Sequence, residues 1–167
     1  DNQVGSYRKE IIIPADWKGE RITLFLERPH IETTVWVNQQ ELGMQNSLCV
    51  PHVYDLTAAT TPGKTYLITI RIDNRIKEIN VGPDSHSITD QTQGNWNGIV
   101  GRIELQATPK VHLEDIQVYP DLSNQKALVR MNIRSASSTK GEITLSAASF
   151  NTDIQHKVAP VHQSFNI

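Results

Sequence analysis

The feature that most constrains the fold of this chain is a period-two alternation of apolar and polar residues. It recurs in segments rich in β-branched and aromatic residues, namely 21–27, 34–38, 66–72 and 102–105. Side chains of a β-strand point alternately to opposite faces of the sheet, so the pattern predicts strands with one buried and one hydrated face. No segment has a convincing amphipathic helical pattern.

Turn residues separate these predicted strands. Segments 14–19 and 61–64 supply proline, which fixes φ, and glycine, which adopts positive φ easily. Many short strands with such punctuation indicate a sandwich or a barrel, so we expect an all-β fold.

A domain boundary is expected near residue 108. The polar stretch 74–98 is the longest irregular segment, and a strand series resumes after Thr108-Pro109-Lys110 with segments 111–118, 127–134 and 142–150. We therefore divide the chain into domains 1–108 and 109–167. The second is shorter than the roughly 100 residues of an immunoglobulin-type sandwich, so we expect it to be truncated.

The composition of the chain argues against several classes of function. The 167 residues have a net charge of −2 with no basic cluster for nucleic acid, and no apolar run long enough to span a membrane. The six histidines lack metal-ligand spacing, so we expect neither a metal nor a cofactor. The single cysteine, Cys49, is expected to be a small buried apolar residue. No signal peptide is visible, and the compartment stays open, with the periplasm and secretion both compatible.

An ordered set of motifs covers residues 7–105. They are Tyr7-Arg8-Lys9, Trp17-Lys18-Gly19, Val35-Trp36-Val37-Asn38, Pro51 before Asp55-Leu56-Thr57, Ile70-Arg71-Ile72-Asp73-Asn74 and Trp96-Asn97-Gly98-Ile99. In order and spacing the series resembles the sugar-binding domain of glycoside hydrolase family 2, which includes β-galactosidases, β-glucuronidases and β-mannosidases. Two places depart from the family pattern: Gln39 replaces a turn glycine, and residues 47–50 replace a Gly-Gly-aromatic run.

The resemblance implies a fold and a role. The fold would be a jelly-roll β-sandwich of the galactose-binding-domain type followed by a partial immunoglobulin-like β-sandwich. The role would be that of a non-catalytic N-terminal region of a β-galactosidase-like enzyme. In the family both catalytic glutamates lie on a downstream barrel that this chain lacks, so the parent protein would be a glycosidase and the chain alone inactive. The implied partners are a β-glycoside and that barrel. A homo-oligomer is also possible, because the family has a first jelly-roll strand before Tyr7, and a sheet edge left unpaired without it would invite association with a second copy.

Individual motif residues have structural explanations beside the functional ones. Trp36 and Trp17 are expected to pack rather than to bind sugar. Asp55 is expected to close a turn, because Asp side chains accept backbone hydrogen bonds there. The adjacent carboxylates Glu114 and Asp115 lie on a predicted strand, where neighbouring side chains diverge, so we do not expect them to act on one glycosidic bond.

The candidate carbohydrate-binding residues lie in the long polar stretch, where the resembled family reaches toward its barrel. They are Asp90, Gln91, Asn95 and Trp96. Carboxylate and amide groups hydrogen-bond sugar hydroxyls, and an indole ring can stack on a pyranose face. The structural alternative is a solvated loop with Trp96 as its anchor in the core.

Two other functions stay open on the sequence alone. A free-standing carbohydrate-binding module would need a complete site on the jelly roll, although an aromatic content of 6% makes a broad stacking platform difficult. A structural or adhesive sandwich would need no ligand at all.

Overall fold

The computed structural model describes residues 4–75, 96–148 and 158–167. By its internal contacts the chain forms two compact units, residues 1–109 and 110–167. The prediction of an all-β fold is confirmed, since the described residues form antiparallel strands and one short 3-10 turn, η1 (Ala15–Trp17). Among them no helix has the length and apolar character needed to cross a membrane.

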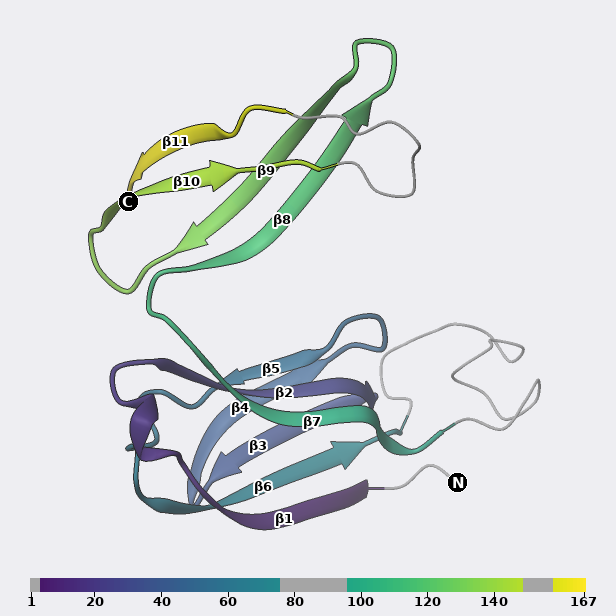
Figure 1. Ribbon diagram of the computed structural model, residues 1–167. Coiled ribbons are helices and arrows are strands. Elements are labelled where there is room, and N and C mark those ends of the chain that lie inside the picture. The colour runs from purple at the N-terminus through teal and green to yellow at the C-terminus, as the bar shows by residue number, and fades with distance from the viewer. Residues whose placement is uncertain (1–3, 76–95, 149–157) are drawn as a thin grey trace, which may run out of the picture. The chain divides into compact units, whose positions relative to one another are not determined.

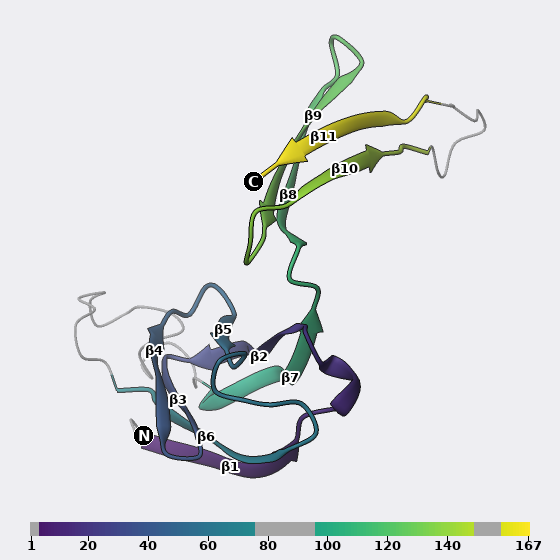
Figure 2. The same ribbon diagram turned by 90° about the vertical axis from the view of Figure 1, so that its left-hand side faces the viewer.

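The first unit contains two antiparallel sheets (Figures 1 and 2). One has the order β1 (Val4–Ile12), β6 (Thr65–Asp73), β3 (Glu32–Val37) and β4 (Gln40–Asn46). The other has the order β5 (His52–Asp55), β2 (Arg21–His30) and β7 (Gly98–Thr108).

The core of the first unit follows from the alternation in the sequence. Val35 and Val37 of β3 are buried while Trp36 between them is half-buried, and every second residue of β6 from Ile68 to Ile72 is also buried. The two sheets, with Ile13 and Leu56 directly after β1 and β5, thus supply one apolar cluster: Ile13, Ile22, Leu24, Leu26, Val35, Val37, Tyr54, Leu56, Ile68, Ile70 and Ile72. Trp17 packs against this cluster, which confirms the packing role expected for it.

Polar side chains close the turns. The backbone N–H of Thr57 donates to Asp55 Oδ1 at 2.9 Å, as expected for a turn-closing aspartate. At the hairpin between β3 and β4, Asn38 takes the positive φ of 54° that a glycine often supplies, and its Oδ1 accepts from Leu67 N–H at 2.9 Å. The prediction for Cys49 is wrong: the residue is exposed, because it lies between β4 and β5 on no strand that would turn it inward.

The second unit contains two strand pairs, β8 (His112–Asp121) with β9 (Lys126–Arg134) and β10 (Lys140–Leu145) with β11 (Val161–Asn166). A β-bulge between Leu113 and Asp115 shifts the register of the first pair. None of the described residues of this unit is buried, and Ile116 and Val118 are 54% and 60% exposed. Its assignment to an immunoglobulin-like domain stays a prediction.

Candidate functional site

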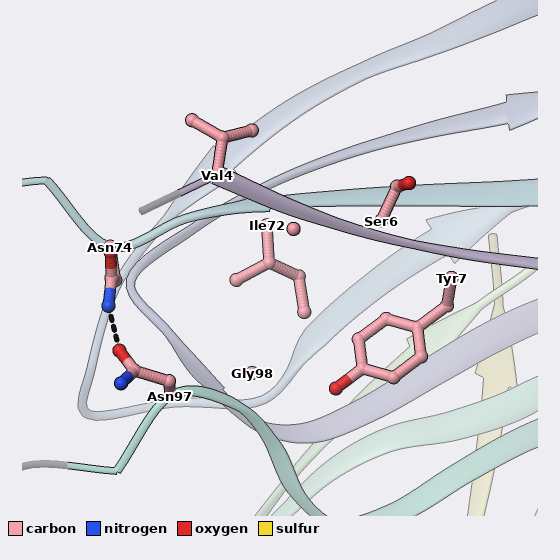
Figure 3. A pocket seen from close by; sticks show the side chains of 8 residues that line it. Val4, Ser6, Tyr7, Ile72, Asn74, Asn97 and Gly98 are labelled. Carbon is pink, nitrogen blue, oxygen red and sulfur yellow. Dashed lines mark hydrogen bonds between the residues drawn. The ribbon is translucent and has the colours of Figure 1, made fainter. Parts of the chain in front are cut away.

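The candidate site lies where β6 ends and β7 begins. We call the described residues that flank segment 76–95 the loop stem: Asp73, Asn74, Arg75, Trp96, Asn97 and Gly98. Strand pairing places other strand ends beside it, since Val4 and Glu32 both pair with Asp73, and His30 pairs with Gly98. The two sides of the loop stem are joined directly, because Asn74 Nδ2 donates a hydrogen bond to Asn97 Oδ1 (Figure 3).

A pocket of about 470 Å³ lies next to this hydrogen bond. Its lining includes Tyr7 and Ile72 together with both asparagines, as Figure 3 shows. Gly98 forms part of the wall with φ +84°, and a Cβ at this position would lie 2.5 Å from the Tyr7 hydroxyl oxygen. The close approach of Tyr7 therefore depends on glycine at position 98. The pocket combines amide and phenol groups with an apolar floor, a mixture that suits hydrogen bonding to a small polar ligand.

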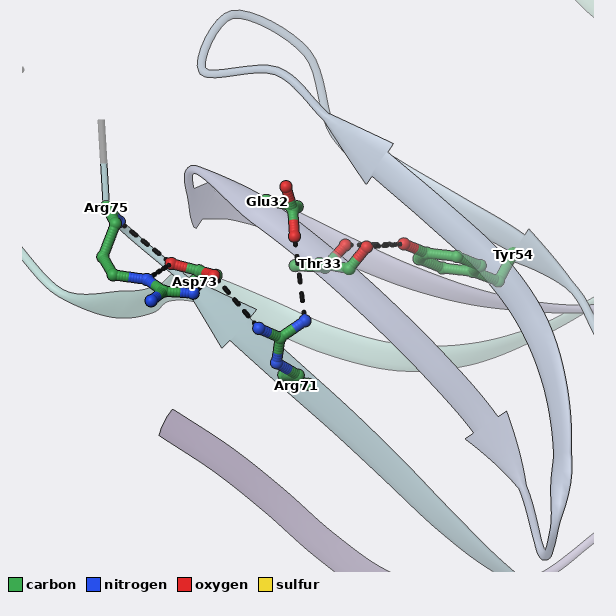
Figure 4. Close-up of polar contacts among 6 residues, drawn as sticks. All are labelled: Glu32, Thr33, Tyr54, Arg71, Asp73 and Arg75. Carbon is green, nitrogen blue, oxygen red and sulfur yellow. Dashed lines mark hydrogen bonds and ion pairs between the residues drawn. The ribbon is translucent and has the colours of Figure 1, made fainter. Parts of the chain in front are cut away.

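An ion-pair cluster fixes the side of the loop stem that leaves β6 (Figure 4). Arg75 donates from Nε to Asp73 Oδ1 at 2.9 Å and from Nη2 to Oδ2 at 2.7 Å, and its backbone N–H also donates to Oδ1 at 3.1 Å. Arg71 Nη2 donates to Asp73 Oδ2 at 3.1 Å. Hydrogen bonds from the guanidinium to Asp73, together with the charge of that carboxylate, raise the pKa of Arg75. This network sets the direction in which the chain leaves β6.

Two carboxylates of this cluster are direct cross-strand neighbours, Glu32 and Asp73. Such positions have the close spacing that a retaining glycosidase needs between its acid and its nucleophile. However, Arg71 lies against both, with Nη1 3.9 Å from Glu32 Oε1, and the Asp73 side chain is 1% exposed. A carboxylate that is inaccessible and held by two guanidinium groups cannot attack a sugar, so the cluster is structural.

Trp96 is the one predicted site residue within the described part of the chain. Its ring packs edge-on against His30, with ring centroids 5.1 Å apart and an interplanar angle of 71°. His30 is buried, whereas Trp96 remains 37% exposed. The indole is therefore anchored at the loop stem and also accessible from solvent. Asp90, Gln91 and Asn95 lie outside the described residues.

Several residues of the site were not predicted as a group. Tyr7 and Asn74 were noted in the sequence motifs, but their meeting with Asn97 depends on the pairing of β1 with β6 and on the return of the chain into β7. His30 gave no sequence signal beyond being one of six histidines. No group of three or more potential metal ligands occurs within residues 4–75, 96–148 and 158–167.

Comparison with known proteins finds β-glucuronidases and β-galactosidases among the relatives of this chain. No protein-family model matches the chain. A β-glucuronidase of Paenibacillus borealis is 24% identical over 151 residues, which cover 82% of this chain and 25% of that enzyme. A β-galactosidase of Halalkalibacterium halodurans is 26% identical over 157 residues, which cover 92% of this chain and 14% of that enzyme. The chain thus spans a quarter or less of the length of these relatives.

Solved structures share the fold. The β-glucuronidase 2 of Bacteroides uniformis, covalently bound to cyclophellitol-6-carboxylate aziridine, superposes with a TM-score of 0.77 at 18% identity, covering 100% of this chain and 20% of that one. A glycosyl hydrolase family 2 member from Bacteroides cellulosilyticus DSM 14838 gives a TM-score of 0.70 at 19% identity, covering 98% of this chain and 21% of that one. At such low sequence identity, the structural similarity supports a shared fold and nothing further.

Proposed function

Because its curated relatives and its fold support a domain of glycoside hydrolase family 2, we propose that this chain is a non-catalytic N-terminal region of such a glycosidase. Its partial coverage of those relatives is consistent with this assignment. The parent enzyme would hydrolyse a β-galactoside or a related glycoside, and its catalytic carboxylates would lie on a barrel beyond this chain.

The observation that most supports an accessory role is the construction of the loop stem. Asp73 holds Arg75 through three hydrogen bonds, the two asparagines join the ends of the segment, and His30 anchors Trp96. These contacts fix the two described ends of the connection, Asp73 to Arg75 and Trp96 to Gly98. We propose that the connection helps to shape a carbohydrate pocket on the neighbouring barrel, with Trp96, Asp90, Gln91 and Asn95 as its sugar-facing residues.

This proposal predicts that the chain alone is inactive and binds sugar weakly at best. A pocket shared with another domain lacks most of its convergent polar groups when that domain is absent. The test is an NMR titration of the labelled chain with galactose, glucuronic acid and mannose, following the three tryptophan indole signals, alongside assays with aryl glycosides. We expect no saturable shift and no hydrolysis. Hydrolysis by the pure chain would contradict an accessory role.

A free-standing carbohydrate-binding module is the second candidate, favoured by the partly exposed Trp96 and by the 470 Å³ pocket that the next two residues, Asn97 and Gly98, help to line. It predicts saturable shifts centred on the Trp96 indole. Trp96→Ala would then abolish binding, whereas Trp17→Phe, which changes a residue packed against the core, would leave it intact. The same titration therefore separates the two functions.

A further inference from the structure

Asn97 and Gly98 form a reactive pair of residues in the loop stem. The backbone nitrogen that follows an asparagine can attack the side-chain amide of that asparagine, because both groups belong to one short stretch of chain and close a small ring. A side chain on the following residue hinders this approach, and glycine has none. Residues 97 and 98 are the one Asn-Gly sequence in the chain.

The fold itself requires the glycine that leaves Asn97 open to this attack. Gly98 has φ +84°, and a Cβ there would lie 2.5 Å from the Tyr7 hydroxyl oxygen. A bulkier residue, which would shield the Asn97 amide, is therefore excluded at position 98. Gly98 is also the first residue of β7 and pairs with His30, the last residue of β2. Local opening is easiest at strand ends, so the Gly98 nitrogen becomes accessible without global unfolding.

Asn74 prepares the side chain of Asn97 for the reaction. Asn97 is exposed, and its Oδ1 accepts a hydrogen bond from Asn74 Nδ2 (Figure 3). Attack on the amide carbon Cγ moves negative charge onto this oxygen, and a fixed donor at that position stabilises the charge. Asn74 is buried directly after β6, so the donor is held in place.

We propose that Asn97 is a site of spontaneous deamidation, with Asn74 as the positioning residue that accelerates it. The Gly98 nitrogen gives its proton to hydroxide and forms a bond to Asn97 Cγ. The bond from Cγ to Nδ2 breaks, and the amide nitrogen takes a proton from water and leaves as ammonia. Water then opens the cyclic imide. The inference goes beyond the accessory function and does not depend on it.

The ring can open in two directions, and the products differ in their effect on the loop stem. If the bond from the Gly98 nitrogen to Cγ breaks, the product is aspartate, which keeps an oxygen that can accept from Asn74 Nδ2. If the bond from that nitrogen to the backbone carbon of residue 97 breaks, the product is isoaspartate. Isoaspartate adds a methylene to the backbone directly before Gly98, which displaces the glycine from its fitted position against Tyr7.

The first test compares the reaction at two asparagines of the same chain. Asn124 is the internal control, because it is also exposed but is followed by Gln125. After incubation in warm, mildly alkaline buffer, tandem mass spectrometry of peptides measures the conversion of each amide to an acid. We expect Asn97 to convert at least about tenfold faster than Asn124. Equal rates at the two residues, or a rate at Asn97 that is no higher in alkaline than in neutral buffer, overturn the proposal.

The second test addresses the role of Asn74. We expect Asn74→Ala to slow the conversion of Asn97 about tenfold, which is less than the loss of one oxyanion donor costs in a water-excluded active site. A purely structural partner would have the opposite effect, because its loss frees the Asn97 side chain to move. Asn46→Ala is the matched control, since it makes the same change at the exposed end of β4. Tryptophan fluorescence verifies that both variants are folded. An unchanged or faster reaction in Asn74→Ala overturns the role assigned to Asn74.

The third test separates the two products. Asn97→Asp reproduces the aspartate product alone, and fragmentation of the peptides gives the isoaspartate share of the incubated, unchanged chain. We expect Asn97→Asp, incubated in parallel, to keep a higher urea midpoint than the unchanged chain once isoaspartate has accumulated in it. Equal midpoints overturn the proposed effect of isoaspartate on the loop stem.

Discussion

Position 98 requires a residue that can adopt positive φ and that has no side chain to collide with the Tyr7 hydroxyl. We predict that Gly98→Ala lowers the free energy of unfolding by about 1–3 kcal/mol, through left-handed strain and a steric clash. Urea unfolding followed by tryptophan fluorescence measures this in the first unit, which contains all three tryptophans.

Gly19 provides the control for that substitution. It has φ +92° and no atom within 4 Å of an added Cβ, so Gly19→Ala adds strain without the clash. We expect it to cost less than Gly98→Ala, and adding Tyr7→Phe to Gly98→Ala should recover much of the difference. Equal losses for both alanine variants would show that Tyr7 does not restrict the site.

His52 is the residue through which pH should act on the first unit. Burial lowers the pKa of its imidazole, and the hydrogen bond from Nε2 to the Ser47 carbonyl opposes this only in part. Below about pH 6.5 the unfolded chain therefore binds a proton that the folded chain resists, so stability is lost as the pH falls. We predict that His52→Gln reduces this pH dependence, measured as unfolding free energy between about pH 7.5 and pH 5.5.

His162 is the matched control for His52. It is 56% exposed and belongs to the second unit. His162→Gln should leave the pH dependence seen by tryptophan fluorescence unchanged. An unaltered slope in His52→Gln would show that another group causes the acid sensitivity.

At the scale of elements, Gln45 is the connection between the edges β4 and β5. We predict that Gln45→Ala lowers the unfolding free energy of the first unit by about 1–2 kcal/mol, because two hydrogen bonds to Val53 are lost. Gln40→Ala, an exposed change in the same strand, should have little effect. Chemical denaturation of both variants makes the comparison, and equal stability would mean that the bridge contributes nothing.

The sequence pattern predicted the strands that line the core and also segments 111–118, 127–134 and 142–150 of the second unit, but it missed the polar strands β4 and β11. Segments 21–27 and 66–72 correspond to β2 and β6, and alternate residues of each belong to one cluster: Ile22, Leu24 and Leu26, and Ile68, Ile70 and Ile72. Strand β4 was missed because its sequence, QELGMQN, is mostly polar and its residues are exposed or half-buried. Strand β11 is likewise largely exposed. Such strands are formed by hydrogen bonds to a neighbouring strand, which no local pattern reveals.

The candidate site could be predicted only in part for a similar reason. Trp96 could be proposed because an aromatic residue follows a long polar stretch. Its contact with His30 depends on the pairing of β2 with β7, between residues far apart in sequence. The bidentate contact of Arg75 with Asp73 is local, but the burial of Asp73 depends on the sheet around it. The roles of Asp90, Gln91 and Asn95 stay predictions.

At the scale of the whole molecule, the two units should differ in the protection of their amides. The buried apolar cluster belongs entirely to the first unit, and the described residues of the second are all at least partly exposed. We predict slow hydrogen exchange in β2, β3 and β6 and fast exchange in β8 to β11, because local opening is easiest where few apolar contacts oppose it. Exchange measured by mass spectrometry on peptides tests this. Comparable protection in β8 would contradict it.

The bulge in β8 affects how the facing of its side chains is inferred when this sequence is aligned with others or mutated. Leu113 lies opposite Ile133 and Ile116 opposite Met131, so residues three apart occupy the same apolar face with Glu114 as the extra residue. Counting by twos from either end of the strand therefore gives opposite answers about which side chains face solvent. Deleting Glu114 alone would remove the bulge and leave Leu113 and Ile116 on the same face, so the strand would keep its pairing with β9 while losing one residue.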